Sequence, residues 1–418
     1  MTEIERVLDV LGGAAHAELV EDRVELLRFG RSRLTYQHSE ERVTLRARLI
    51  RDGRSVWGTL GSTEPAAVAR MRERLERLAR SMPPGEVEPL AAPSQARAAT
   101  TAFDATERAE AADRVALFAE TRDTLPAGAE LGGSVTHSTV RHSVANTAGA
   151  LQSETRTRAL LQTVGTLDGH SSWARVVTRD AAAISIPDLA ATLAQLPVRT
   201  LEPGRYRALL EPQAVITLLA TLGQVGFAAN APGSFEDRLG STLFSPLLSV
   251  VDDGCDDAGL PTTFDCNGQA KQRVSLVEHG TVRGVVSHDT GHGAPPAWRF
   301  GSGPAASHLV AAAGAASDED LLGACWTGLS LQRVDYVRVV QPRQTLVTGS
   351  SRDATLWVEG GEVVARLPQF RFTLRLDELF ASLEAVGARR ERGETVFMES
   401  IVAPGVVVDA FPVDFVTG

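Results

Sequence analysis

A single tight turn constrains the first part of this chain more than any other short feature. In RVTLRARLIRDGRSVWGTLG, two runs of alternating apolar and polar residues flank the pair Asp52-Gly53. An Asp-Gly pair between alternating runs is the strongest short-range signal of a β-hairpin, because both residues tolerate positive φ. The segment therefore predicts two antiparallel strands with one apolar face, and that face requires a covering layer.

The segment that follows the hairpin supplies such a cover. From 65 to 82, Val68, Met71 and Leu75 recur every three or four positions, which predicts an amphipathic helix. A second helix is expected from about 105 to 120. The residues from about 130 to 180 then follow the pattern of successive antiparallel strands, with an Asn-Thr-Ala-Gly turn beginning at Asn146.

The composition and the residue pattern of the chain change near residue 204, where glycine becomes frequent and short strand-like runs dominate. We predict an α+β fold with two domains. Residues 1–204 form an antiparallel sheet with flanking helices, and residues 205–418 form a β-rich domain with a few helices. Two of those helices are expected after the cap residue Ser317 and over 376–386.

Composition excludes several classes of protein. A net charge of -10 and a pI near 5.5 argue against a nucleic-acid binder and against docking on anionic membranes. The three cysteines, Cys255, Cys266 and Cys325, are typical of a reducing compartment, and the sequence contains no signal-peptide pattern or 18-residue apolar run. We therefore expect a cytoplasmic protein. Lys271 is the only lysine, a bias that we attribute to coding composition.

Few residues suggest chemistry by their spacing. His288 and His292 flank a carboxylate in HDTGHGAPPAW, but the glycines and prolines remove the helical geometry of a two-histidine metal site. The alternatives are a metal site or a loop of hydrogen-bonded imidazoles. Cys266, next to Asp265, is a candidate nucleophile, although nothing in the sequence places a base beside it. Cys255 and Cys325 are weaker nucleophile candidates, and the retained site candidates are Cys266, Asp265, His288 and His292.

An ordered set of segments carries a resemblance to a known family. GSFEDRLGSTLFSPLLSVVDDG (233–254), TTFDCNGQAKQRVSLVEHGTVRGVV (262–286), LWVEGGEVV (356–364) and PQFRFTLRLDELFASLEAVG (368–387) follow one another, after the earlier NTAG turn. In this order they resemble the TldD/PmbA family, also described as modulators of DNA gyrase. The similarity extends over nearly the whole chain, and the order of the segments is more specific than any one of them.

The resemblance implies a division of labour between two kinds of subunit. TldD-type subunits carry a His-Glu-x-x-x-His helix that binds zinc together with a cysteine near the C-terminus, whereas PmbA-type (TldE) subunits lack these ligands. In this chain the helix after the ALLEP strand reads QAVITLLATLG, no histidine occurs between His170 and His279, and no cysteine follows Cys325. The chain is therefore similar to the metal-free subunit.

The resemblance also implies a partner and a substrate. The expected assembly is a heterodimer or larger complex with a TldD-like catalytic subunit, which holds the zinc and processes unfolded or ribosomally made peptides. This chain would hold no catalytic, cofactor or metal residue. It would stabilise the zinc subunit and shape a peptide cavity, and an extended peptide could add to a sheet edge.

Two other functions stay open. One is a stand-alone, metal-free hydrolase or biosynthetic enzyme that uses Cys266 with His288 or Asp265, because Cys266 and Asn267 replace acids common in the family. The other is a homodimeric protein that binds peptides without cleaving them. The same departures leave open a housekeeping or a specialised biosynthetic role, and the charge balance argues against direct action on DNA gyrase.

Overall fold

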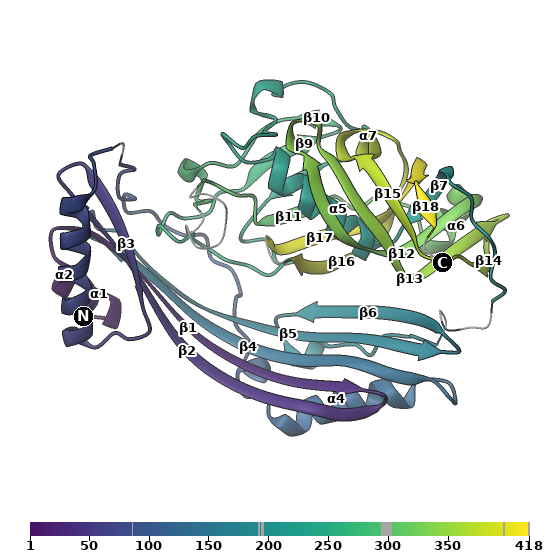
Figure 1. The fold of residues 1–418 in the computed structure, drawn as a ribbon, viewed down its shortest axis with the longest axis horizontal. Helices are drawn as coiled ribbons and strands as arrows, with labels where there is room; N and C mark the ends of the chain where they lie inside the picture. Colours follow the sequence, from purple (N-terminus) through teal and green to yellow (C-terminus); the bar gives the residue numbers. More distant parts are fainter. Residues whose placement is uncertain (86, 191–192, 194–195, 294–302, 396–397, 417–418) are drawn as a thin grey trace.

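The computed structural model describes residues 1–85, 87–190, 193, 196–293, 303–395 and 398–416. It confirms the predicted α+β class, with an antiparallel N-terminal sheet and a β-rich C-terminal part. In Figure 1 the N-terminal strands form a long curved sheet along one side of the molecule, and the C-terminal elements lie against it. The domain border expected between residues 204 and 205 stays a prediction.

The N-terminal sheet is antiparallel throughout its described strands, in the order β3-β2-β1-β4-β5-β6. Its strands are β1 (Ala14–Gly30), β2 (Arg33–Arg51), β3 (Arg54–Leu60), β4 (Glu130–Asn146), β5 (Leu151–Leu167) and β6 (His170–Thr178). The predicted turn between β2 and β3 is confirmed: Asp52 and Gly53 have φ values of 49° and 69°. Oδ1 of Asn146 accepts hydrogen bonds from the backbone of Ala148 and Ala150, which closes the turn between β4 and β5.

Helices cover one face of this sheet. They are α1 (Glu3–Leu11), α2 (Pro65–Ser81), α3 (Asp104–Glu107) and α4 (Ala111–Asp123), so the single helix expected over 105–120 is interrupted. α1 and α2 pack on one end of the sheet through Leu11 and Val68, and Phe118 of α4 packs against Phe29 at the other. Odd-numbered residues of β1 lie under these helices, which leaves the even-numbered face toward the C-terminal half.

The C-terminal sheet is mixed, because β7 and β11 run parallel to one neighbour and antiparallel to another. Its described strands are β7 (Gly204–Leu210), β8 (Val250–Asp252), β9 (Val274–Glu278), β10 (Thr281–Val282), β11 (His308–Ala311), β12 (Thr327–Gln341), β13 (Leu346–Glu359), β14 (Glu362–Arg366), β15 (Phe370–Arg375), β16 (Leu383–Thr395), β17 (Met398–Val413) and β18 (Phe415–Val416). The accompanying helices are α5 (Pro212–Gly226), α6 (Asp318–Cys325) and α7 (Leu376–Ala381), with short 3-10 turns at Ala181–Ala183, Glu236–Arg238, His288–Thr290 and Pro342–Gln344.

Both faces of the central strands are buried, which explains the apolar run of β17. Leu210 and Val408 pack in the core that includes α5, whereas Leu209, Val407 and Cys325 form a smaller cluster on the opposite face, under α6.

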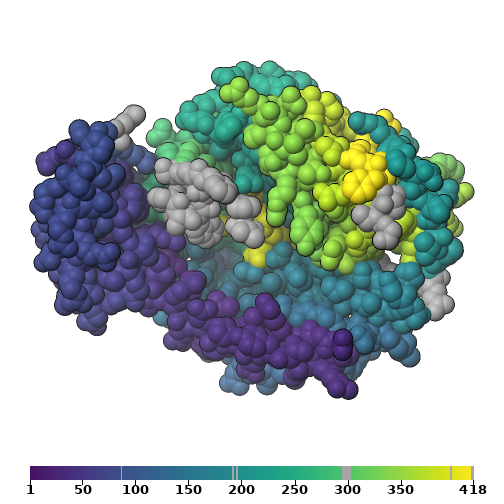
Figure 2. All heavy atoms as spheres, in the orientation of Figure 1, coloured from purple at the N-terminus to yellow at the C-terminus, as the bar shows by residue number. Residues whose placement is uncertain are grey.

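Among the described helices, none is long and apolar enough to cross a bilayer. Figure 2 shows the N-terminal half in purple along one side of the molecule and the C-terminal half in green to yellow on the other.

The prediction of one helix over 376–386 was wrong. α7 ends at Ala381, and the chain continues as β16 from Leu383. Leu383 pairs with Val408 and Val386 pairs with Val406 of β17, so both apolar side chains are buried by sheet pairing. Apolar residues spaced by three can therefore be buried in a strand with an irregular register as well as on one face of a helix.

Candidate functional site

A cavity of about 1710 Å³ lies between the even-numbered face of the N-terminal sheet and the C-terminal half. Strands β1, β2, β4, β5 and β6 form one wall, which we call the N-wall. Helix α5, strand β12, the facing ends of β16 and β17, and the loops around Thr262 and Ser307 form the other, the C-wall. Small-molecule pockets typically measure roughly 300–1,000 Å³, so this cavity has room for several residues of a peptide.

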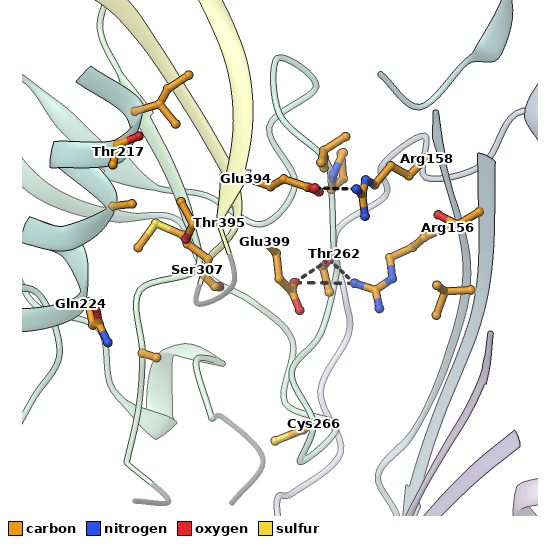
Figure 3. A pocket seen from close by; sticks show the side chains of 18 of the residues that line it. Arg156, Arg158, Thr217, Gln224, Thr262, Cys266, Ser307, Glu394, Thr395 and Glu399 are labelled. Atoms are coloured by element: carbon orange, nitrogen blue, oxygen red, sulfur yellow. Dashed lines mark hydrogen bonds and ion pairs between the residues drawn. The ribbon is translucent and has the colours of Figure 1, made fainter. Parts of the chain in front are cut away.

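The N-wall presents arginines that are held by carboxylates. Arg46 lies 2.9 Å from Glu18, across the β1–β2 pair. Arg158 of β5 and Arg175 of β6 both contact Oε1 of Glu394, at 2.5 and 2.7 Å. Glu394 belongs to β16, so this shared carboxylate links the two sheets across the cavity, as Figure 3 shows for Arg158. Burial, together with the neighbouring guanidinium groups, lowers the pKa of Arg175.

A second link between the walls centres on Glu399 of β17. Arg156 donates a hydrogen bond to the Thr262 hydroxyl at 2.7 Å, and that hydroxyl donates to Oε2 of Glu399 at 3.1 Å. Figure 3 shows Arg156 and Glu399 facing each other beside Thr262. Burial alone would raise the pKa of Glu399, but Arg156, Lys271 and His308 lower it to about 2. Glu399 is therefore an anion at neutral pH.

Helix α5 lies on the C-wall and carries the aliphatic segment QAVITLLATLG. It follows β7, begins with Pro212 at the first helical position, and buries residues on nearly every side, as expected for a helix without a polar face. Its cavity-lining residues are Gln213, Ile216, Thr217, Ala220, Thr221 and Gln224. The Thr217 and Thr221 hydroxyls donate to backbone carbonyls four residues earlier.

These α5 side chains do not fit a zinc site. Protein ligands of zinc are thiolates, imidazoles and carboxylates, and the cavity side of α5 offers amides, hydroxyls and alkyl groups instead. Across the described ranges, no group of three His, Cys, Asp or Glu side chains is gathered so as to hold a metal ion. We therefore derive no chemical step in this chain that passes through a metal.

A buried polar network lies behind the C-wall, next to the loop around Ser307. Asp252 is fully buried and its Oδ1 lies 2.7 Å from Nε2 of His292, which is also fully buried. Its Oδ2 accepts the backbone N–H groups of Ser307 and His308 at 2.7 and 3.1 Å. Burial would raise the pKa of Asp252, but His292 and Lys271 hold it well below its usual range. Asp252 thus fixes the backbone from which Ser307 projects.

Lys271 reaches the same point from another loop. Its Nζ lies 2.6 Å from Oγ of Ser307 and 3.1 Å from Nδ1 of His308, and its side chain is buried. Nε2 of His308 lies 3.1 Å from the Leu260 carbonyl. Burial, reinforced by the charge of Lys271, lowers the pKa of His308 to about 3, so its imidazole is neutral at pH 7.

The site residues that the sequence singled out make different contacts in the structure. His292 lies in the buried network and lines the cavity, whereas Nδ1 of His288 lies 3.1 Å from Glu88. Cys266 is buried, its thiol is 3.4 Å from the Gly293 carbonyl, and burial raises its pKa well above the usual range. A buried thiol with a raised pKa is a poor nucleophile. Asp265 accepts the backbone N–H groups of Asn267 and Gln269 in its own loop and that of Gly293, which follows His292.

Sequence reasoning did not find Ser307, His308 or Glu399 as site residues. They are widely separated from Asp252 and Lys271 along the chain, and only the pairing of β8 with β11 and of β11 with β17 brings them together. The one available signal was Lys271 itself. A single lysine in a chain with 41 arginines is unusual and marks its position.

The fold matches proteins of known structure. A family model described as the PmbA/TldA metallopeptidase C-terminal domain matches residues 203–414. TldE from Thermococcus kodakarensis superposes with a TM-score of 0.85 at 17% identity, covering 99% of this chain and 100% of that protein. No curated protein matches the sequence.

Two further structures extend the match. A candidate modulator of a DNA gyrase from Thermotoga maritima has a TM-score of 0.83 at 16% identity, with coverage of 98% and 99%. A candidate modulator of DNA gyrase from Bacteroides thetaiotaomicron has a TM-score of 0.77 at 16% identity, with coverage of 98% and 96%. At this identity the structures establish a shared fold, and the family model covers half of the chain. The chain belongs to the PmbA/TldD family and has its metallopeptidase-like fold.

Proposed function

We propose that this chain is a TldE-like subunit that supplies a cavity wall, and no zinc ligand, to a heteromeric zinc-dependent peptidase in the cytoplasm. The observation that supports this proposal is the position of α5. The helix lies on the wall of a cavity of about 1710 Å³, and the side chains that it turns to the cavity are not zinc ligands. The zinc would be held by a TldD-like partner.

The substrate would be an extended, unfolded peptide. A cavity of this size accepts several residues. At its wall, β6 pairs only with β5 among the described strands of its sheet, so it is an edge to which a peptide backbone can hydrogen-bond with little sequence preference. Paired charges such as Arg158 and Glu394 line the cavity and can exchange partners with polar peptide groups. The chain would stabilise the catalytic subunit and limit which peptides reach its zinc.

Co-expression with the TldD-like protein from the same genome tests the proposal. We expect the two chains to elute together in size-exclusion chromatography, and the partner alone to lose most of its peptidase activity. Separate elution, with full activity in the partner alone, would contradict it. A homodimer of this chain that binds peptides without a partner would support the peptide-binding alternative.

A variant that narrows the cavity tests the role of the wall separately from assembly. Thr217 and Thr221 are partly exposed on α5, so Thr221→Trp would place an indole in the cavity. We expect the complex to form but to cleave a long peptide at least about tenfold more slowly. Thr124→Trp, on the exposed end of α4, is the matched control. Equal cleavage rates in the two variants would argue against a substrate path along α5.

A further inference from the structure

The contacts of Lys271 with Ser307 and His308 indicate a reaction in the cavity that does not require the proposed partner. Ser307 is partly exposed and lines the cavity, in contrast to the buried Lys271 and His308 beside it. In Figure 3 it lies on the side of α5 and Thr395, across from Arg156 and Arg158. A hydroxyl that faces a peptide-sized cavity with an amine 2.6 Å behind it has the geometry of a nucleophile with its base.

The hydrogen bonds around this pair admit the direction that a general base requires. The Leu260 carbonyl accepts the Nε2 proton of His308, which leaves Nδ1 as an acceptor. Nδ1 lies 3.1 Å from Nζ of Lys271 and 2.9 Å from Oγ of Ser307, so it can accept from either group. When it accepts an N–H of Lys271, the lone pair of the unprotonated amine can face the hydroxyl of Ser307. The third group of such an arrangement orients the base, and His308 occupies that place.

The backbone at this point is also fixed. Oδ2 of Asp252 binds the N–H groups of both Ser307 and His308, and Asp252 is itself held by the buried His292. The charge of Lys271 helps to hold the pKa values of Asp252 and Glu399 below their usual range. A general base acts through its unprotonated form, so the proposed reaction requires the free amine of Lys271.

We propose that Ser307 is a nucleophile for acyl transfer, with Lys271 as its general base and His308 as the residue that positions the lysine amine. The substrates are ester or amide carbonyls of peptide-sized molecules that enter the cavity. Oγ of Ser307 forms a bond to the carbonyl carbon while its proton moves to Nζ of Lys271. The bond to the leaving group then breaks, and the leaving group takes that proton.

Water completes the cycle. It attacks the acyl-serine carbonyl and gives one proton to Lys271, the carboxylic acid departs, and Oγ of Ser307 recovers its proton from Lys271. No oxidant, metal or second co-reactant is required. If the network only stabilised the fold, Ser307 would react no faster than any other accessible serine.

A fluorophosphonate probe tests the nucleophile on the isolated full-length chain. Its phosphorus forms a bond to Oγ as fluoride leaves, and peptide mass spectrometry locates the adduct. We expect labelling at Ser307 at about pH 8 to be at least about tenfold faster than at Ser138, and no adduct at that peptide in Ser307→Ala. Ser138→Ala, which removes a cavity-lining serine of β4, should label at Ser307 like the wild type. Absence of the Ser307 adduct would overturn the proposal.

The role of Lys271 needs a test that does not remove it, because its loss would leave the charge of Asp252 less compensated. In Ser307→Cys, the adjacent ammonium should lower the pKa of the new thiol. Alkylation by iodoacetamide should then have its midpoint at least about one pH unit below the usual thiol value of about 8.5. Ser138→Cys is the control. Coinciding midpoints for the two thiols would show that Lys271 does not act on this position.

Both experiments use the chain without a partner, so their outcome does not depend on the proposed peptidase complex. Labelling of Ser307 together with failure to bind a TldD-like subunit would support this inference and contradict the proposed function. Binding to a TldD-like subunit without labelling of Ser307 would support the proposed function and contradict this inference.

Discussion

The two walls of the cavity differ in how far their charged side chains are exposed to solvent. The N-wall includes an ion pair that is open to solvent: Arg42 and Asp22 keep 60% and 19% of their side-chain surface exposed, whereas Arg46 and Glu18 deeper in the wall keep 17% and 5%. On the C-wall, Asp252 and His292 keep none, and their contacts continue to Ser307 and Lys271. Exposed pairs contribute little to stability and rearrange easily, whereas a buried charge without its partners is costly. One wall can adapt to a ligand, and the other holds its groups in place.

The same contrast holds for how each wall is built. Each long strand of the N-wall turns alternate side chains to the cavity, so its arginines follow from a period of two. The C-wall network combines residues from β8, β11 and the loops between them. Its geometry depends on the whole fold. We therefore expect substitutions on the C-wall to disturb stability more than equivalent substitutions on the N-wall.

The largest effect should come from Asp252→Ala. The substitution leaves His292 and the N–H groups of Ser307 and His308 without their acceptor in the protein interior. We expect the free energy of unfolding to fall by about 3–5 kcal/mol. The matched N-wall variant, Asp22→Ala, should cost no more than about 1 kcal/mol. Urea unfolding of both variants is the measurement, and similar losses would remove the distinction between the walls.

A pH experiment sharpens the comparison, because the N-terminal sheet buries one imidazole on the face away from the cavity. Burial, with the nearby Arg114, lowers the pKa of His137 from 6.5 to about 4. The unfolded chain therefore binds more protons between these values, and stability falls as the pH drops through this window. For this one group the loss between pH 7 and pH 5 is about 2 kcal/mol.

His137→Leu should remove that part of the acid sensitivity. The free energy of unfolding should then decline less between pH 7 and pH 5 than in the wild type. His38→Leu, at a half-exposed position of β2, is the matched control. Denaturant titrations at the two pH values give the comparison. An unchanged slope in His137→Leu would place the sensitivity in other buried imidazoles whose pKa is lowered, such as His16 of β1 and His308.

The smallest effect should come from Glu394→Gln, which removes the carboxylate shared by Arg158 and Arg175. These side chains are 15–34% exposed, so we expect a loss of about 1 kcal/mol at low ionic strength. The loss should shrink in about 1 M salt, since screening weakens both the attraction and the repulsion left between the arginines. Glu384→Gln, which affects a single pair with Arg207, is the control. A loss that salt does not change would indicate a fully buried interaction.

Local signals predicted the N-terminal half well. The Asp52-Gly53 turn, the helix beginning at Pro65 and the turn at Asn146 all follow from backbone preferences that act over a few residues. The helix expected over 376–386 failed, because the pairing of Leu383 with β17 is a contact between segments far apart in the chain. Tertiary pairing can override a short periodic pattern.

The candidate site was predicted only in part. The position of α5 after its strand and the aliphatic character of the helix were readable, and the structure places the helix on the cavity wall. Cys266 and His288 contact different groups, the Gly293 carbonyl and Glu88, and their pairing stays a prediction. Ser307 and Lys271 could not be paired from sequence, since 35 residues and two strand registers separate them.

The central claim is that this chain forms the wall of a peptide cavity while another chain holds the zinc. Metal analysis by mass spectrometry, on the isolated protein and on the complex co-purified with its TldD-like partner, tests it most directly. We expect about one zinc ion per heterodimer in the complex, and peptidase activity only there. Stoichiometric zinc in the isolated chain, or zinc-dependent cleavage of peptides by it alone, would contradict the account.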